Sequence, residues 1–291
     1  GLSTHVVLDE AAGHAVIVGT SVRALSERPD GTLDPAEVAD AFRDPTDVHQ
    51  PITGLVILEN THAHSMGQPL SARYTTTIAS IAHERGVPLH VDGARIFNAA
   101  IAVGVAPRDL AAPAESRRVC LSKGLACPIG SVVLGSRDFI WRARRARKLL
   151  GGGMRQVGVV AAPGLIALRD GPAGMIERLA EDHANARRLA EALSEMAGIV
   201  SAGGLAQPVP GRLDPGRVRT NFVIFRVARD RAGFLDALRP RGVLMDAYPH
   251  DQVRAVTHYG IEGRDIDATL AAVAAALGET SRRDPAPAGV A

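Results

Sequence analysis

The chain has 291 residues, which is enough for a substantial core in one large domain or two unequal ones. Its net charge of +2, from 33 basic and 31 acidic residues, gives no indication of a nucleic-acid partner. No apolar run is long enough to cross a bilayer, no signal peptide is recognisable and the two cysteines lack metal-ligand spacing, so we expect a cytoplasmic protein without a membrane partner.

Apolar runs alternate with helical patterns in the front part of the chain, which is typical of a mainly parallel sheet covered by helices. The predicted strands are residues 55–58, 87–91, 119–121 and 132–134. A helix is predicted from Ser71, with Gly86 as its stop signal. A basic helical face around 142–148 is followed by three glycines and then by an apolar helix from about Arg155 to Leu168.

The rest of the chain is richer in short strands. A long amphipathic helix is predicted for residues 175–196, and we place the domain boundary inside it, with a large domain at 1–185 and a small one at 186–280. Beyond it we expect a surface loop at 203–216, strands at 221–227, 243–245 and 254–257, helices at 231–238 and 266–277, and a disordered tail at 281–291.

Any amine chemistry depends on two residues, because Lys123 and Lys148 are the only lysines in the sequence. Lys123 directly follows one apolar run, and Asp92 closes the run before it. A pyridoxal phosphate (PLP) enzyme needs these two groups, a lysine that forms the Schiff base and a carboxylate that keeps the pyridine nitrogen protonated. Ligands of open α/β sheets collect at the carboxyl ends of strands, where both residues are predicted to lie.

Four motifs carry a resemblance to a known family. They are residues 58–62 (LENTH), 90–99 (HVDGARIFNA), 120–125 (CLSKGL) and 147–156 (RKLLGGGMRQ). In order and spacing they are similar to the low-specificity L-threonine aldolases, and the likeness extends from His5 to about Ala276.

The resemblance implies a PLP-dependent lyase that cleaves L-threonine or L-allo-threonine to glycine and an aldehyde. It implies PLP fold type I, that of aspartate aminotransferase, with a mainly parallel large domain and a small α+β domain. It also implies a small amino-acid substrate, and a homodimer or homotetramer with shared active sites.

The same resemblance assigns the cofactor site. Lys123 matches the Schiff-base lysine and Asp92 matches the partner of the pyridine nitrogen. Arg95 stands where the family has an arginine near the phenolic oxygen of the cofactor, and His5 matches the histidine that stacks on its ring.

The substrate site is assigned in the same way. His62 matches the histidine near the substrate hydroxyl, and Arg254 matches the arginine that holds the substrate carboxylate, a task that suits a planar fork of donors. A histidine suits the role of the base, since its ordinary pKa lies near neutrality, and either His5, His62 or a water between them could act. Arg155 and Lys148 match positions of the site shared between subunits, although the basic surroundings of Lys148 also fit a solvated lysine.

Three other interpretations stay open, one of which is a non-catalytic fragment. A related PLP enzyme could act on another β-substituted amino acid, as a phenylserine aldolase or by β-elimination. A metal-dependent hydrolase could use His62 and His64, with His90 and Asp92 at the end of the next strand. The family's phosphate-binding loop has no counterpart after Gly1, so we also expect that the 291 residues alone bind PLP weakly, aggregate and show little activity.

Overall fold

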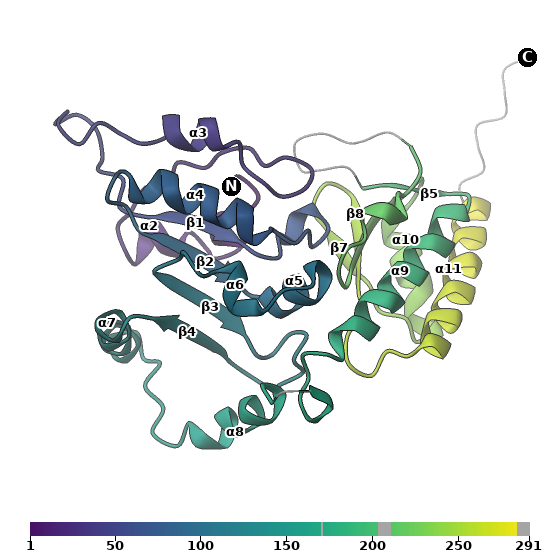
Figure 1. Ribbon diagram of the computed structural model, residues 1–291. Coiled ribbons are helices and arrows are strands. Elements are labelled where there is room, and N and C mark those ends of the chain that lie inside the picture. The colour runs from purple at the N-terminus through teal and green to yellow at the C-terminus, as the bar shows by residue number, and fades with distance from the viewer. Residues whose placement is uncertain (170, 203–210, 284–291) are drawn as a thin grey trace, which may run out of the picture. The chain divides into compact units, whose positions relative to one another are not determined.

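The chain divides into two compact units in the computed structural model, which describes residues 1–169, 171–202 and 211–283 (Figure 1). The first unit is Gly1–Ala180 and the second is Glu181–Ala291. The division falls at the start of helix α9 (Leu179–Glu195). No helix in the described part of the chain is long and apolar enough to cross a membrane.

The first unit is built on a four-stranded sheet in the order β1-β2-β3-β4 (Figure 1). Its strands are β1 (Val56–Glu59), β2 (Leu89–Gly93), β3 (Ser116–Cys120) and β4 (Ser131–Gly135). The first three are parallel, and β4 runs antiparallel to β3. All four apolar runs therefore form strands as predicted, and the mainly parallel sheet is confirmed.

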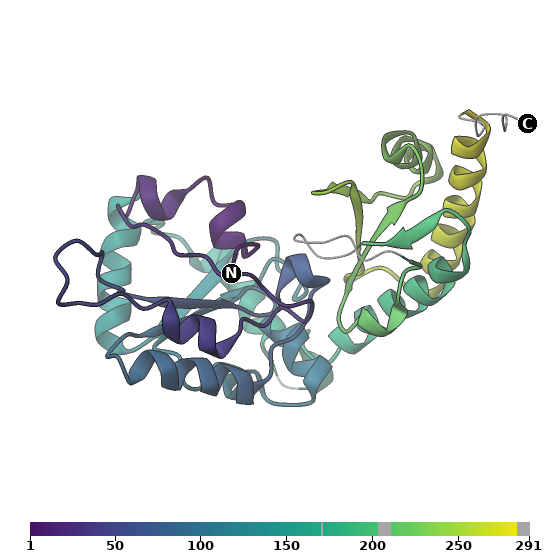
Figure 2. The ribbon, with the colours of Figure 1, turned by 90° about the horizontal axis from the view of Figure 1, so that it is seen from above.

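Helix α4 (Ala72–His83) covers part of this sheet (Figure 2). It begins where the sequence indicated, because the side chain of Ser71 caps it by accepting a hydrogen bond from the backbone N–H of Tyr74. Its buried residue Ile78 joins Leu58, Leu89 and other apolar side chains in the core of the unit. The remaining helices of this region are α1 (His5–Leu8), α2 (Gly13–Val16), α3 (Pro35–Asp40), α5 (Ile96–Val103) and α6 (Pro107–Leu110).

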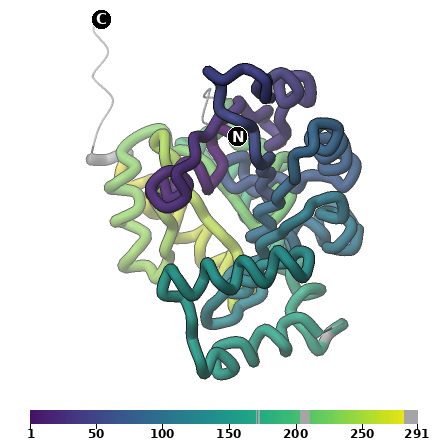
Figure 3. The backbone as a smooth tube through the Cα atoms, turned by 90° about the vertical axis from the view of Figure 1, so that its left-hand side faces the viewer, coloured from purple at the N-terminus to yellow at the C-terminus, as the bar shows by residue number. Residues whose placement is uncertain are grey.

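The edge strand β4 is more exposed than its neighbours. Val132, Val133 and Leu134 are 37%, 45% and 41% exposed, although valine and leucine usually lie inside. Helix α7 (Arg137–Leu149) follows β4 and has no buried residue. The chain then passes through residues 150–157 into α8 (Gly158–Ala167), as Figure 3 shows. The apolar helix thus starts three residues later than Arg155, which lies in a turn.

The second unit has an antiparallel sheet in the order β5-β6-β8-β7. Its strands are β5 (Ile199–Ser201), β6 (Phe222–Val227), β7 (Asp246–Tyr248) and β8 (Gln252–Val256). Its helices are α9, α10 (Arg231–Leu238) and α11 (Gly263–Arg283). Phe222, Phe225 and Phe234 are fully buried and form the centre of its core.

Two expectations for this unit are corrected. The strand predicted at 243–245 is wrong, because Leu244 is 77% exposed and pairing with β8 begins only at Asp246. The last helix continues to Arg283, so residues 281–283 of the expected tail are helical. The rest of the tail, 284–291, and residues 203–210 of the expected loop lie outside the described residues.

Candidate active site

The carboxyl ends of β1, β2 and β3 meet at one edge of the parallel sheet. The register pairs Glu59 with Asp92 and Asp92 with Arg118, so three charged residues lie side by side on neighbouring strands. The chain after β1 carries His62, and the chain after β3 carries Lys123. The structure therefore brings three of the four sequence motifs to one edge, the place where open α/β sheets bind ligands.

Lys123 lies in a tight loop that follows β3. The carbonyl of Lys123 accepts a hydrogen bond from the N–H of Ala126 at 2.9 Å. Gly124 follows it in a closely packed position, since a Cβ atom there would lie 2.8 Å from the Leu179 side chain and 2.9 Å from Oδ1 of Asn98. This close packing fixes the loop and holds Lys123 half-buried.

The surroundings of Lys123 favour its neutral, nucleophilic form. Burial lowers the pKa of the amine, and the guanidinium groups of Arg95 and Arg118 lower it further. Cys120 and Asp92 act in the opposite direction but do not outweigh them. Lys123 therefore loses its proton more readily than an exposed lysine does, as a nucleophilic amine should.

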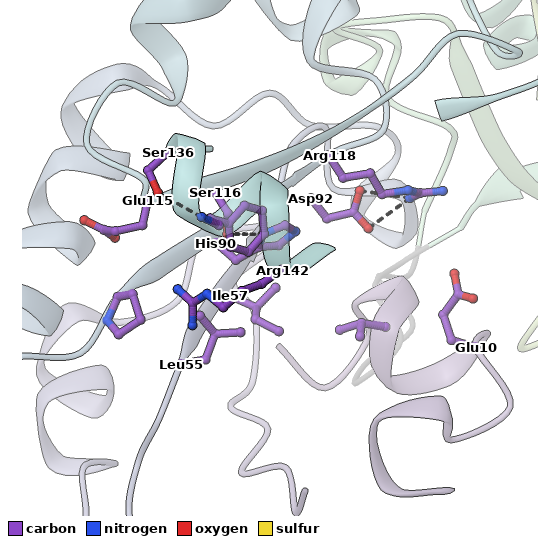
Figure 4. Close-up of a pocket in the computed structure, with 13 residues that line it drawn as sticks. Glu10, Leu55, Ile57, His90, Asp92, Glu115, Ser116, Arg118, Ser136 and Arg142 are labelled. Atoms are coloured by element: carbon purple, nitrogen blue, oxygen red, sulfur yellow. Dashed lines mark hydrogen bonds and ion pairs between the residues drawn. The ribbon is translucent and has the colours of Figure 1, made fainter. Parts of the chain in front are cut away.

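Asp92 is held by three hydrogen bonds at the end of β2. Its side chain is 14% exposed, and its Oδ1 accepts a hydrogen bond from the N–H of Ala94 at 3.1 Å. One guanidinium nitrogen of Arg118, Nη1, donates to Oδ1 at 3.1 Å and to Oδ2 at 3.2 Å (Figure 4). Gly93 allows β2 to end close to β3, because a Cβ there would lie 3.0 Å from the carbonyl oxygen of Arg118.

Arg118 lies outside the four sequence motifs. Burial alone would lower the pKa of the Arg118 guanidinium, but the nearby carboxylate of Asp92 raises it. The alternation of side chains along the strand is a signal that could have revealed it. Arg118 precedes Cys120 by two positions on the same strand, so the two side chains lie on one face of the sheet. The parallel register of β2 and β3 would then have placed it beside Asp92.

The same face of the sheet forms a groove of about 920 Å³, drawn in Figure 4. Asp92 and Arg118 line it, and His90 and Ser116 form the preceding pair, with 2.8 Å between Nδ1 of His90 and Oγ of Ser116. Glu10 lines the groove from the segment after α1.

His5 is anchored close to this edge. Its backbone N–H donates to the carboxylate of the buried Glu59 at 2.6 Å, which links α1 to the end of β1. Its ring remains 40% exposed, and its Nδ1 lies 2.8 Å from Oε1 of Glu10. The candidate stacking residue is therefore fixed by its backbone while its ring stays accessible.

His62 has different surroundings, because only 1% of its side chain is exposed. Its Nδ1 lies 3.0 Å from Oγ of Ser65, and its Nε2 lies 3.4 Å from Oε1 of Glu27. The loop that carries Glu27 packs closely here, since a Cβ on Gly31 would lie 2.7 Å from Cβ of His62. Glu27 also lies outside the sequence motifs, 35 positions before His62 in a segment without periodic pattern.

Glu27 is a strongly perturbed carboxylate. Burial raises its pKa, but the contact with His62 and the hydrogen bond from the N–H of Ser3 lower it to about 2. Only 8% of its side chain is exposed. The carboxylate is therefore ionised throughout the neutral range and faces the ring of His62.

The other candidate residues lie apart from this cluster in the chain. Arg254 is on β8 in the second unit, where its Nη2 donates to Oδ2 of Asp246 at 2.7 Å and its guanidinium lies 5.0 Å from the ring centre of Tyr248. Lys148, near the end of α7, and Arg155, in the turn before α8, are both exposed.

The residues proposed for a metal site do not form one. His64 is buried, with its Nε2 3.4 Å from Oδ2 of Asp9, and His62 instead faces Glu27 and Ser65. Within the described ranges there is no group of three or more His, Cys, Asp or Glu side chains that could hold a metal ion. The geometry therefore gives the hydrolase interpretation no donor cluster.

Comparisons with known proteins agree with this geometry. The family described as beta-eliminating lyase matches residues 2–208. Low specificity L-threonine aldolase of Escherichia coli (strain K12) is 40% identical over 262 residues, which cover 90% of this chain and 71% of that protein. Low-specificity L-threonine aldolase 1 of Arabidopsis thaliana is 38% identical over 275 residues, covering 93% and 72%. The resemblance inferred from the four motifs is thus confirmed.

Solved structures confirm the expected fold. A threonine aldolase from Leishmania major superposes with a TM-score of 0.72 at 18% identity, over 95% of this chain and 76% of that one. An aspartate aminotransferase from Rhodobacter sphaeroides 2.4.1 superposes with a TM-score of 0.57 at 19% identity, over 86% and 61%.

Proposed function

Because the chain belongs to the beta-eliminating lyase family, we propose that it is a PLP-dependent carbon–carbon lyase that cleaves L-threonine and L-allo-threonine to glycine and acetaldehyde. One observation carries this proposal: a half-buried lysine with a lowered pKa, Lys123, lies near a carboxylate at the end of a neighbouring strand, Asp92. This pair stands in a chain that matches two L-threonine aldolases over nine-tenths of its length.

The side chains at the strand ends fit PLP in their chemistry. Lys123 supplies an amine that can bind the aldehyde of the cofactor, Asp92 supplies a carboxylate for the ring nitrogen, and Arg95 supplies a cation for the phenolic oxygen. When bound, PLP supplies an electron sink for the electrons of a broken Cα–Cβ bond. We propose that the first unit is the cofactor-binding domain and the second unit the small domain.

The chain's own residues bind the substrate and move its protons. We assign Arg254 to the substrate carboxylate, which a guanidinium can hold through two parallel hydrogen bonds. A base must take the β-hydroxyl proton so that the Cα–Cβ bond breaks and the aldehyde leaves; a proton added at Cα then gives glycine.

Accessibility favours His5 over His62 as this base. The ring of His5 is 40% exposed, whereas that of His62 is 1% exposed and lies between Ser65 and Glu27. We therefore expect His5→Asn to lower kcat more than His62→Asn does, and steady-state kinetics of the two variants test this. A larger loss in the His62 variant would reverse the assignment.

We also propose that the chain assembles into homodimers or homotetramers with shared active sites, in which Lys148 and Arg155 contact the site of a neighbouring copy. The proposal is supported by exposed apolar side chains between these two residues, Leu149 at 85%, Leu150 at 66% and Met154 at 55%. Light scattering coupled to size-exclusion chromatography gives the mass in solution, and a monomer at assay concentration would contradict the proposal.

The reaction would take part in threonine breakdown and glycine formation. We propose a cytoplasmic location, supported by Cys120 and Cys127, which are both buried free thiols. Fractionation of cells with an antibody against the chain tests the location, and recovery outside the cytoplasmic fraction would contradict it.

The products identify the reaction. Purified protein is supplied with PLP and L-threonine, and glycine, acetaldehyde, ammonia and 2-oxobutanoate are measured in the same samples. Aldol cleavage gives glycine and acetaldehyde in equal amounts, whereas β-elimination gives ammonia and 2-oxobutanoate. A parallel assay with phenylserine, followed by benzaldehyde release, tests the preferred aldehyde. Ammonia and 2-oxobutanoate without glycine would replace the proposal by β-elimination.

A further inference from the structure

Arg118 occupies a position beside Asp92 that the four sequence motifs do not assign. The two residues face each other in the register of β2 and β3, and Nη1 of Arg118 lies 3.1 and 3.2 Å from the two carboxylate oxygens. Both side chains are largely shielded, with 14% of Asp92 and 29% of Arg118 exposed. A shielded charge pair of this kind is stronger than an exposed one, because water screens it less.

The pair belongs to the groove face of the sheet, as Figure 4 shows. The neighbouring Arg117 points the other way, as alternation along a strand requires. Its guanidinium donates to the carbonyl oxygens of Ala111 and Ala112 at 2.6–2.9 Å. Two adjacent arginines thus have separate tasks: Arg117 stabilises the chain before β3, and Arg118 contacts the candidate cofactor site.

The hydrogen bonds to Asp92 leave one of its oxygens available. Oδ1 accepts from both Ala94 and Arg118, whereas the structure gives Oδ2 the single donor from Arg118. A carboxylate oxygen has two lone pairs, so Oδ2 retains an acceptor position. These hydrogen bonds fix the side chain of Asp92 and leave Oδ2 able to accept a hydrogen bond from a further N–H group.

We propose that Arg118 is a positioning residue for PLP, which holds the Asp92 carboxylate in the rotamer that accepts the N–H of the cofactor ring. The inference rests on the proposed function, because it assumes that Asp92 contacts the ring nitrogen. Arg118 acts through Asp92, so its contribution to cofactor binding depends on that carboxylate. This dependence can be measured in a double-mutant cycle.

The test measures PLP binding by the full chain and does not depend on catalysis. The dissociation constant is obtained by equilibrium dialysis, and the absorbance of the bound cofactor is recorded, for wild type, Arg118→Ala, Asp92→Asn and the double variant. We expect Arg118→Ala to weaken binding roughly tenfold, the equivalent of one charge-assisted hydrogen bond. In the Asp92→Asn background the same change should weaken binding less than about twofold.

Two further variants separate positioning from folding. Arg118→Lys keeps the charge and should recover part of the lost affinity, whereas Arg117→Ala removes a guanidinium from the same strand and should leave the affinity within about twofold of wild type. Circular dichroism melting shows which variants are folded; if Arg118→Ala does not fold, the cycle is run with Arg118→Lys.

Three results would overturn the inference: affinity unchanged in Arg118→Ala, affinity increased by it, or an equal loss with and without the Asp92 carboxylate. The last would mean that Arg118 contacts the cofactor directly. Weak binding by wild type, as expected for these 291 residues, is measured at correspondingly high PLP concentrations. If wild type shows no PLP binding even there, the proposed function fails together with the inference. If wild type binds and forms glycine but Arg118→Ala binds equally well, only the inference fails.

Discussion

Glu27→Gln should remove a large, pH-dependent part of the stability of the first unit. The carboxylate is 8% exposed, lies 3.4 Å from Nε2 of His62 and accepts a hydrogen bond from the N–H of Ser3 at 2.8 Å. Its pKa is lowered from 4.5 to about 2, because these partners outweigh the effect of burial. A decrease of this size corresponds to about 3 kcal/mol of folding free energy.

The sign of the pH dependence follows from the lowered pKa. The folded chain binds this proton less readily than the unfolded chain, so the contribution of Glu27 is complete above about pH 4.5. It is then lost as the pH falls from about 4.5 towards about 2. At pH 6 the variant should therefore be less stable than wild type by up to about 3 kcal/mol, and by roughly 1 kcal/mol at pH 3.

Urea unfolding at the two pH values measures this difference. Circular dichroism follows the unfolding of the whole chain. Glu84→Gln is a matched control, because the side chain of Glu84 is 73% exposed and the change should alter stability little. Equal stability of wild type and the Glu27 variant at pH 6, or a difference that grows as the pH falls, would refute the reasoning.

Three further predictions concern the candidate site. Lys123→Ala should abolish the cofactor link that borohydride can reduce and lower turnover by several orders of magnitude, whereas Lys148→Ala should keep the link. Mass spectrometry after borohydride reduction distinguishes the two variants. A reducible link in the Lys123 variant would exclude Lys123 as the Schiff-base lysine. Asp92→Asn should retain cofactor but lower kcat by about two orders of magnitude, because a neutral amide does not stabilise a protonated ring nitrogen. Near-normal turnover of this variant would mean that Asp92 has only a structural role. Arg254→Lys should raise KM for L-threonine roughly tenfold, since a point charge replaces a two-pronged donor; an unchanged KM would remove Arg254 from the site.

The sequence predicted the sheet of the first unit because each strand overlaps with a short apolar run, and the runs of β1, β2 and β3 are followed by polar residues. Their boundaries differ from the observed ones by one to three residues. Helix α5 was missed because residues 96–103 are apolar nearly all round, which makes a helix hard to distinguish from a buried strand. The strand at 243–245 was predicted from apolar residues alone, whereas pairing with β8 decides where β7 lies.

Residues of the candidate site were predictable only where a local sequence pattern marks them. Lys123 and Asp92 were found because each follows an apolar run in the same part of the chain. Arg118 required the register between two strands, and Glu27 required the path of a loop that returns to His62 from 35 positions away. Neither contact is encoded in a local pattern, because both arise from tertiary packing.

The exposure of β4 has a consequence for the behaviour of the chain at high concentration. β4 lies at the edge of its sheet, and three consecutive apolar residues, Val132, Val133 and Leu134, are each more than one-third exposed. An edge strand of this composition offers backbone hydrogen bonds and apolar contact to any strand that approaches it, which is the usual first step of edge-to-edge aggregation. Solubility should therefore be limited at this strand rather than at the charged helix α7, and a single inserted charge, Val133→Lys, should raise the concentration at which light scattering begins.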